Sequence, residues 1–268
     1  MKITLIQMNS GADKAANLAA AEALIEDAVA RERPDMIALP ETFALMTGDS
    51  VGKRAEAETI PDGPACRMLS ALARKHGVWI HGGSLHEAAG GKCHNTTTVW
   101  DRAGKLCAQY RKLHLFDVDV PGGASYRESD TILAGDSVVC FEAEAITFGC
   151  AICYDLRFPE LFRALRDRGA QAIFLPSAFT LMTGRDHWEP LLRARAIETQ
   201  CYMIAPAQIF AHDGGRRVCY GRSMVVDPWG VVQATASDRV GHVSACIDPD
   251  YVHEVRAALP VGGHHVLG

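Results

Sequence analysis

The sequence has no long apolar run, no surplus of positive charge and no regular cysteine spacing. No uninterrupted apolar stretch approaches the roughly 20 residues that a transmembrane helix needs. The segment 1–10 is too short in its apolar part for a signal peptide. The formal net charge of -5 argues against a nucleic-acid partner, which usually requires a basic face. We therefore expect neither a membrane nor a nucleic acid as a partner.

The cysteines indicate a reducing compartment. The chain contains 9 of them, scattered without the spacing of a disulfide framework. An odd number of unpatterned thiols is typical of reduced cysteines, so we expect a cytoplasmic protein. Low-complexity segments and flexible linkers are also missing, and 268 residues are enough to bury a substantial core. We therefore predict a single domain over residues 1–268.

Short apolar runs alternate with helical patterns along the chain. Residues 12–31 carry apolar side chains at three- and four-residue spacing, which predicts a helix. Pro64 opens a second helix that ends before Gly77. Asp186 and Glu189 form a capping pattern that predicts the start of a third. Strands outnumber helices, and several are joined directly as hairpins. This pattern favours layered sheets covered by helices, a mixed α/β fold, over pure βαβ winding.

Three segments place a reactive side chain in an unusual setting. Glu41 comes just after a buried strand, and Lys112 ends a strand-like segment among apolar and aromatic neighbours. Taken singly, each has a plainer interpretation as an exposed residue. Cys153 lies where an apolar strand passes into charged residues and a helix opened by Pro159. A nucleophile at such a turn is lifted out of the sheet, and the backbone N–H groups after it can point at an oxyanion.

Other interpretations of these residues are open at this point. Cys153 could be a buried and inert thiol. With Cys150 it forms a C-x-x-C, which suggests a redox or metal pair. However, residues three apart face opposite sides of a strand, and no second pair completes a zinc site. A Cys–His protease dyad is compatible with the spacing. Four histidines match no ligand pattern: His81, His86, His94 and His114. Neither a metal nor a cofactor is expected.

Taken together, the three segments resemble motifs of the nitrilase superfamily of carbon–nitrogen hydrolases, in the chain order glutamate, lysine, cysteine. The matching segments are 39–41 (LPE), 110–117 (YRKLHLFD) and 149–160 (GCAICYDLRFPE). The resemblance covers essentially the whole chain and implies a four-layer α-β-β-α sandwich. It also implies that Glu41, Lys112 and Cys153 form a catalytic triad, which hydrolyses a carbon–nitrogen bond through a thioester.

The resemblance makes Glu41 the base of this triad. Glu41 would take the thiol proton and deliver it to the departing nitrogen. To serve both purposes its pKa should be raised, and an apolar pocket beside Pro40 and Phe43 could raise it.

The other expected roles concern charge. Lys112 and the backbone N–H of Tyr154 would hold the tetrahedral oxyanion. Glu128 is similar to a second glutamate of the family, which would hydrogen-bond Lys112 and help to position substrate or water. The plainer interpretation of Glu128 is a carboxylate on a surface loop.

Further segments are most similar to the Nit branch of the superfamily, to its deaminated-glutathione amidases and then its ω-amidases. These segments are 115–121, 126–129, 178–184, 187–189, 192–198 and 223–230. The expected reaction is hydrolysis of deaminated glutathione to 2-oxoglutarate and cysteinylglycine. The alternatives are an ω-amidase acting on α-ketoglutaramate and a hydrolase of another small-acid amide or carbamoyl amide. From another class, the chain could be an idle binding module with the same fold.

Arg157 is the expected contact for the 2-oxo carboxylate that both Nit substrates carry, because a guanidinium can bind a carboxylate at two points. Phe179 and Thr183 would line the same pocket by resemblance. The plainer interpretation of Arg157 is an ion pair with Asp155 or Glu160.

The segment 260–268 replaces the basic tail that is usual in the family. That tail would contribute to a subunit interface. Members of the family usually assemble as dimers or larger, so a homodimer or higher homo-oligomer is expected.

Overall fold

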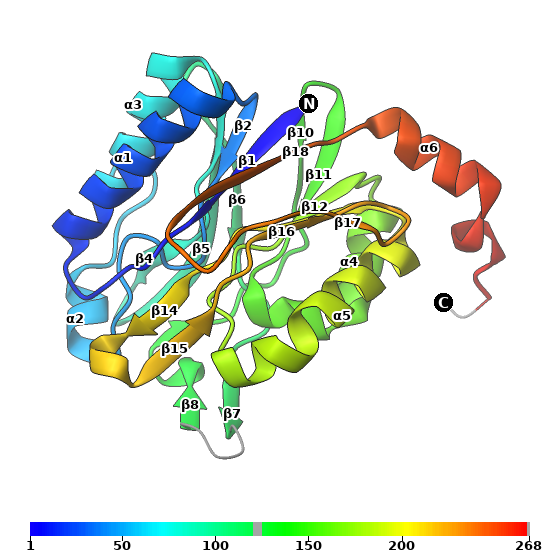
Figure 1. The fold of residues 1–268 in the computed structure, drawn as a ribbon. Helices are drawn as coiled ribbons and strands as arrows, with labels where there is room; N and C mark the ends of the chain where they lie inside the picture. Colours follow the sequence, from blue (N-terminus) through cyan, green and yellow to red (C-terminus); the bar gives the residue numbers. More distant parts are fainter. Residues whose placement is uncertain (120–124, 267–268) are drawn as a thin grey trace.

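The computed structural model describes residues 1–119 and 125–266, in which two β-sheets pack together beneath outer layers of helices (Figure 1). Two segments noted in the sequence extend beyond the described residues. One is the end of the Nit-like segment 115–121, and the other is the end of the tail 260–268.

The first sheet has eight strands, in the order β18-β1-β2-β3-β5-β4, with β6 and β9 also paired to β5. Its strands are β1 (Lys2–Gln7), β2 (Met36–Ala38), β3 (Trp79–His81), β4 (Leu85–Ala89), β5 (Lys92–Trp100), β6 (Leu106–Arg111), β9 (Ile132–Leu133) and β18 (Gly241–Cys246). Helices α1 (Lys14–Glu32) and α3 (Pro64–His76) cover one face. Because side chains alternate along a strand, Ile3 and Leu5 join the core between the sheets, whereas Ile6 joins the core beneath the helices.

The second sheet has six strands, in the order β10-β11-β12-β13-β16-β17. They are β10 (Cys140–Ala143), β11 (Ile146–Cys150), β12 (Ala172–Phe174), β13 (Tyr202–Ala205), β16 (Met224–Val226) and β17 (Val232–Thr235). Helices α4 (Pro159–Asp167) and α5 (Leu181–Thr199) cover its outer face. The neighbours β11, β12 and β13 run parallel, so their carboxyl ends meet at one edge of the sheet.

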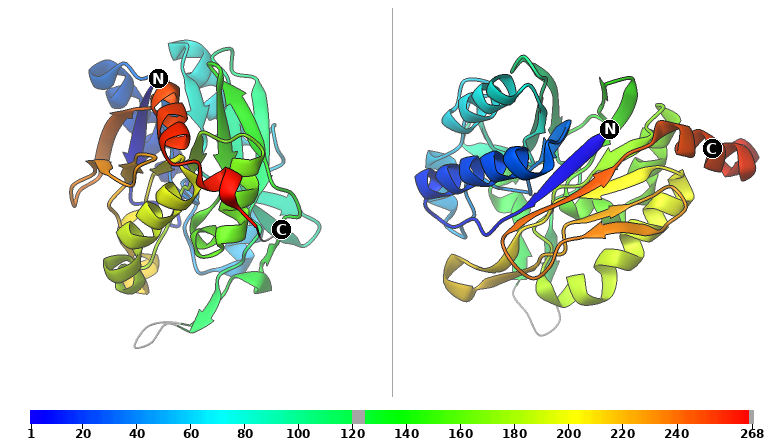
Figure 2. Two further views of the ribbon diagram at one scale, coloured as in Figure 1. Left: turned by 90° about the vertical axis from the view of Figure 1, so that its right-hand side faces the viewer. Right: turned by 45° about the horizontal axis from the view of Figure 1, so that its top comes forward.

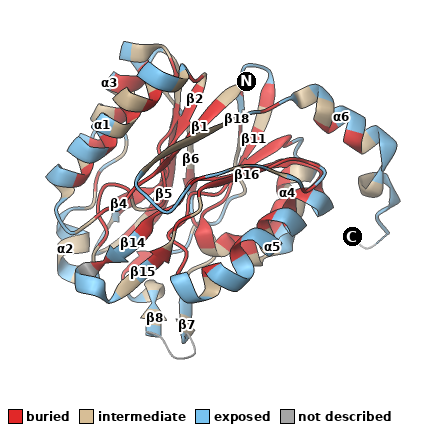
Figure 3. Ribbon diagram, in the orientation of Figure 1, coloured by how far each residue is buried: buried red, intermediate tan, exposed pale blue. Residues whose placement is uncertain are grey.

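The layers therefore follow the order helices, sheet, sheet, helices, and the predicted four-layer α-β-β-α sandwich is confirmed. Burial follows the same order: the strands are mostly buried, and the helices are exposed on their outer sides (Figure 3). Phe148 and Phe174 pack together in the core with ring centroids 5.3 Å apart and ring planes tilted by 31°. In the described part of the chain, no helix is both long enough and apolar enough to cross a membrane.

Smaller elements complete the fold. Two short hairpins lie near the carboxyl ends of the central strands, and α6 extends from the edge of the molecule on the side of α4 and α5 (Figure 2). These elements are α2 (Ser50–Ala55), β7 (Asp117–Asp119) with β8 (Ser125–Arg127), β14 (Ile209–His212) with β15 (Arg217–Tyr220), and α6 (Pro249–Ala258).

Helix ends test the sequence predictions most directly. α3 begins at Pro64 and ends before Gly77, which has a φ of 62°, so this prediction is confirmed. The prediction that a helix begins at Asp186 is wrong, because α5 begins at Leu181 with Thr180 as its N-cap residue. A β-bridge between Thr180 and Cys219 fixes the point at which the chain turns into this helix.

Candidate active site

Cys153 lies just beyond the carboxyl end of β11, in a short 3₁₀ turn that spans Cys153–Arg157 and leads into α4. Its φ is 46°, in the left-handed region that residues other than glycine rarely adopt. The Cys153 N–H donates to the carbonyl of Pro176 at 3.0 Å, which ties the turn to the segment after β12. The turn lifts the side chain out of the sheet, as predicted for a nucleophile at a strand-to-helix junction.

Tyr154 follows Cys153 at the start of this turn. The first backbone hydrogen bond of the turn runs from the Asp155 N–H to the carbonyl of Ile152. The Tyr154 N–H therefore comes before the hydrogen-bonded part of the turn. The first N–H groups of a helical turn have no acceptor within the turn. Its position leaves this group available to a ligand beside Cys153.

Asp155 joins the Cys153 turn to the segment that carries Lys112. Its carboxylate is fully buried and accepts from the Ile152 N–H at 2.8 Å and from the Tyr110 hydroxyl at 2.7 Å. It also accepts from the His114 N–H at 3.1 Å and lies 2.7 Å from His114 Nδ1. Two segments far apart in sequence are thereby held at a fixed separation.

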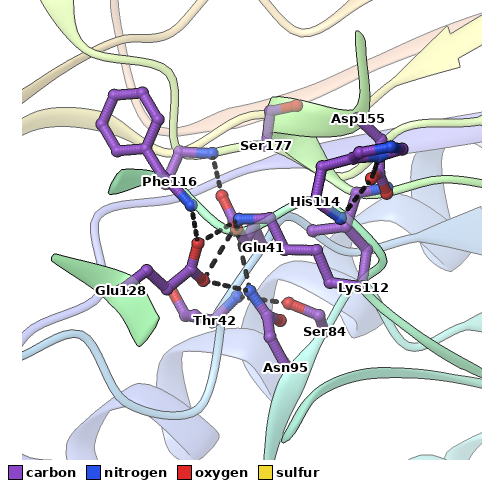
Figure 4. A network of polar contacts seen from close by, with 12 residues as sticks. Glu41, Thr42, Ser84, Asn95, Lys112, His114, Phe116, Glu128, Asp155 and Ser177 are labelled. Atoms are coloured by element: carbon purple, nitrogen blue, oxygen red, sulfur yellow. Dashed lines mark hydrogen bonds and ion pairs between the residues drawn. The ribbon is translucent and has the colours of Figure 1, made fainter. Parts of the chain in front are cut away.

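The buried Glu41 and Lys112 form a charged cluster with the partly buried Glu128 (Figure 4). Cys153 lies beside this cluster. Lys112 Nζ lies 3.1 Å from Glu41 Oε1 and 2.9 and 3.2 Å from the two oxygens of Glu128. The side chain of Lys112 is only 2% exposed, although lysines are mostly found at surfaces. The three sequence segments singled out for reactive residues thus converge on one place.

Backbone and amide groups complete the hydrogen bonding of the two carboxylates. Glu41 Oε2 accepts from the Ala178 N–H at 2.8 Å, and Oε1 accepts from Asn95 Nδ2 at 2.9 Å. Glu128 Oε2 accepts from the Phe116 N–H at 2.7 Å. Glu128 is therefore tied into the cluster, which does not fit its interpretation as a free surface carboxylate.

The charges of the cluster shift the pKa values of its members. Burial raises the pKa of Glu41, but Lys112 and Arg217 outweigh burial and leave it below its ordinary value. The expectation that the surroundings of Pro40 and Phe43 raise this pKa is therefore wrong, because two cations from distant segments lie close to the carboxylate. Burial lowers the pKa of Lys112, but Glu128 and Glu41 outweigh burial and raise it above its ordinary value.

The pKa of Cys153 is shifted in the opposite direction to that of Glu41. Burial, together with the negative charge of Glu41, raises the pKa of the thiol well above its ordinary value. The Glu41 carboxylate lies close enough to the thiol for each group to shift the pKa of the other. At neutral pH the resting site therefore holds a thiol beside a carboxylate, which is the pair that general-base activation requires.

The cluster lies at the bottom of a cavity of about 340 Å³. Arg157, Phe179 and Thr183 all line it together with Glu41, Lys112 and Cys153. The guanidinium carbon of Arg157 lies 5.3 Å from the ring centroid of Phe179 and 6.0 Å from that of Tyr154. Within the described residues Arg157 makes no ion pair with Asp155 or Glu160, so the plainer interpretation of this arginine is wrong.

Two further residues, Asn95 and Arg217, belong to the site without a sequence motif that predicts them. The amide of Asn95 donates to Glu41, and the only sequence signal for it is a lone amide before a run of threonines. Arg217 lies in the hairpin strand β15 and also lines the cavity. No local pattern distinguishes it from an ordinary surface arginine.

The histidines and Cys150 do not form a metal or redox site with Cys153 in the described part of the chain. His81 is fully buried and stacks on Phe174, while His86 lines the cavity. Cys150 is buried in the core between the sheets. In the described part of the chain, no group of three or more His, Cys, Asp or Glu side chains is arranged to hold a metal ion.

Comparison with known proteins agrees with this geometry. The family described as carbon-nitrogen hydrolase matches residues 2–257. The chain is 42% identical over 267 residues to a deaminated glutathione amidase of Synechocystis, covering 98% of this chain and 97% of that protein. It is 38% identical over 260 residues to the omega-amidase NIT2 of Danio rerio, covering 97% of this chain and 92% of that protein.

A solved structure extends the likeness to three dimensions. The crystal structure of the C. elegans NitFhit protein superposes with a TM-score of 0.92 at 42% sequence identity. The match covers 98% of this chain and 64% of that one, so this chain spans less than two thirds of the NitFhit protein.

Proposed function

The chain belongs to the carbon–nitrogen hydrolase family, as its sequence motifs predict, and we propose that it is an amidase that works through a thioester on Cys153. One observation carries this proposal: a buried Glu41 and a buried Lys112 flank the Cys153 thiol at the bottom of an open cavity. Burying two opposite charges costs desolvation free energy, which a purely structural site rarely needs to spend.

Glu41 is the general base of the first half-reaction. As Cys153 Sγ attacks the amide carbonyl carbon, the thiol proton moves to Glu41, whose lowered pKa keeps it ionised beforehand. When the carbon–nitrogen bond breaks, Glu41 gives this proton to the nitrogen and the amine departs. The acyl group remains on Cys153 as a thioester.

The second half-reaction returns the site to its starting state. Glu41 takes a proton from water, and the water oxygen attacks the thioester carbon. The carbon–sulfur bond breaks, the carboxylic acid leaves, and Glu41 returns the proton to Cys153.

Lys112 and the Tyr154 N–H stabilise the oxyanion of both tetrahedral intermediates. Glu128 acts through Lys112: its two hydrogen bonds fix the ammonium, while its bond from the Phe116 N–H fixes Glu128 itself. Because the pKa of Lys112 is raised above its ordinary value, the ammonium stays charged throughout, and no proton has to move on or off it during the reaction.

For the substrate we propose deaminated glutathione, with Arg157, Phe179 and Thr183 holding the 2-oxo acyl half. Support comes from the Synechocystis relative of that name and from the surplus of cationic side chains in the cavity. A second candidate is α-ketoglutaramate, which the similarity to the omega-amidase NIT2 favours.

We further propose that the chain forms one domain and works as a homodimer in the cytoplasm.

The proposed dimer interface is a group of exposed apolar side chains. Ile197 on α5 lies against Gly230 and is exposed, and the neighbouring Trp229 and Val231 are also exposed. Such a cluster of large apolar side chains is typical of an interface between copies. Trp229→Asp should convert the dimer to a monomer, with the molar mass measured by light scattering. An unchanged molar mass would show that the dimer interface does not lie at Trp229.

The thioester can be tested by mass spectrometry. Incubation with deaminated glutathione followed by acid quenching should add the 2-oxoglutaryl group to the Cys153 peptide. Cys153→Ala should abolish the adduct and turnover, whereas Cys150→Ala, three residues earlier in the core, should retain both. Turnover by Cys153→Ala would reject the thioester on Cys153. The absence of both turnover and adduct in the unaltered protein, with either amide, would reject the amidase in favour of a binding module.

Substrate choice is decided by steady-state kinetics. We expect the unaltered protein to have a higher kcat/KM for deaminated glutathione than for α-ketoglutaramate. The reverse order would assign the chain to the ω-amidase reaction.

A further inference from the structure

Arg217 is a guanidinium in the cavity wall that lacks a carboxylate partner among the described residues. Its Nη2 donates to the carbonyl of Ala178 at 3.3 Å, and its guanidinium carbon lies 5.5 Å from the ring centroid of Tyr126. Its Nε is shielded from solvent and has no hydrogen-bond acceptor in the described part of the chain. A buried donor without an acceptor costs free energy, so this arrangement is suited to a ligand that supplies one.

The carboxylates near Arg217 are already committed to another cation. Glu41 and Glu128, the two carboxylates that line the cavity, both pair with Lys112. Arg127, a further cation of the lining, pairs with Asp119 at 3.0 Å. Arg217 therefore has no carboxylate at ion-pair distance in the described part of the chain, although its charge acts on Glu41, and its unpaired Nε–H can donate to an anion that enters the cavity.

The position of Arg217 associates it with one half of the substrate. The backbone of Ala178 lies between the two groups: its N–H donates to Glu41, and its carbonyl accepts from Arg217. In the proposed reaction Glu41 gives its proton to the departing nitrogen, so the leaving amine lies on the Glu41 side. Arg157 packs against the rings of Phe179 and Tyr154, the residue that follows Cys153, which associates it with the acyl half that Cys153 holds.

We propose that Arg217 binds a carboxylate in the leaving-group half of the substrate, while Arg157 binds the carboxylate of the acyl half. This inference rests on the proposed amidase function and assigns a residue to each of the two carboxylates of the proposed substrate, so that amides without a carboxylate on the leaving side are disfavoured. The leaving amine is then an amino acid or a short peptide with a free carboxyl end. An amide that releases ammonia leaves Arg217 without a partner.

The test compares two matched substrates, deaminated glutathione and the same molecule with its glycine carboxylate converted to a carboxamide. The unaltered protein should prefer the free acid by about 10- to 100-fold in kcat/KM, as expected for loss of a charged hydrogen bond. In Arg217→Gln this preference should fall to near one, and Arg217→Lys should retain part of it. Arg239→Gln, an exposed arginine outside the cavity, should keep the full preference.

The ratio of the two substrates separates binding from other effects of the substitution. Arg217 also lowers the pKa of Glu41, so its loss can slow both substrates; a common loss cancels in the ratio. An unchanged preference in Arg217→Gln, or no preference in the unaltered protein, would overturn the inference while leaving the amidase intact. Failure of the unaltered protein to hydrolyse either substrate or to form a Cys153 adduct would instead overturn the proposed function, and the inference with it.

Discussion

The Tyr110 hydroxyl donates a 2.7 Å hydrogen bond to the buried carboxylate of Asp155. Tyr110 lies in β6, two residues before Lys112, and Asp155 lies two residues after Cys153. The bond therefore connects the first sheet to the second at the point where the lysine and the cysteine must meet. It fixes the relative position of these two side chains without contacting the reacting atoms.

Tyr110→Phe removes this bond and leaves one lone pair of a buried carboxylate unsatisfied. We expect a loss of about 1.5–3 kcal/mol in the free energy of unfolding, typical of a hydrogen bond to a charged group. We also expect kcat to fall with little change in KM, because Lys112 and Cys153 lose part of their alignment. Urea unfolding and steady-state kinetics measure the two effects. Tyr251→Phe, in the peripheral helix α6, should change neither; an unchanged kcat in Tyr110→Phe would reject the positioning role.

Lys112→Met should abolish amide hydrolysis and destabilise the fold. Lys112 is the cation shared by Glu41 and Glu128, and removing one partner of a buried ion pair typically costs about 3–5 kcal/mol. Thermal or urea unfolding measures the loss. Adding Glu128→Met to Lys112→Met should recover part of the stability and none of the activity. Recovery of activity in the double variant would show that Lys112 serves the fold only.

The parts of the fold that the sequence predicts well depend on local chemistry. The bounds of α3 follow from Pro64, which needs no N–H acceptor at a helix start, and from Gly77, which adopts a positive φ without strain. The start of α5 depends instead on a β-bridge between Thr180 and Cys219, 39 positions later in the chain. A capping pattern at Asp186 inside the helix could not reveal it.

The same distinction applies to the site. Glu41, Lys112 and Cys153 could be named from the sequence because each lies in a distinctive motif. The pKa of Glu41 could not be predicted from its neighbours in the chain, since Lys112 and Arg217 reach it from distant strands. Arg217 itself was missed because only the folded hairpin places it in the cavity.

The lowered pKa of Glu41 predicts the acid limb of the pH profile. A carboxylate whose pKa lies below its ordinary value of 4.5 stays ionised as the pH falls, so the base remains competent in mildly acidic solution. We expect kcat/KM to stay level from pH 7 to pH 5 and to fall only below 4.5. Initial rates, with pre-incubation at each pH to detect unfolding, measure this profile. A reversible acid limb near pH 6 would mean that the pKa of Glu41 lies above its ordinary value in the free enzyme, contrary to the charge arrangement of the cluster.

His81 should make the fold less stable in acid. Its ring is fully buried against Phe174, with centroids 4.3 Å apart, and burial lowers its pKa to about 3. In the unfolded chain the same ring takes up a proton near pH 6.5, so between these values the unfolded state binds the extra proton and stability falls as the pH is lowered. For this residue alone, the loss between pH 7.5 and pH 5 amounts to about 2 kcal/mol. His81→Leu should therefore show a smaller decrease in unfolding free energy between the two pH values than the unaltered protein, in urea titrations at each. His253→Leu, on the peripheral helix α6, should keep the original decrease, and an equal decrease in His81→Leu would show that His81 does not set the acid sensitivity.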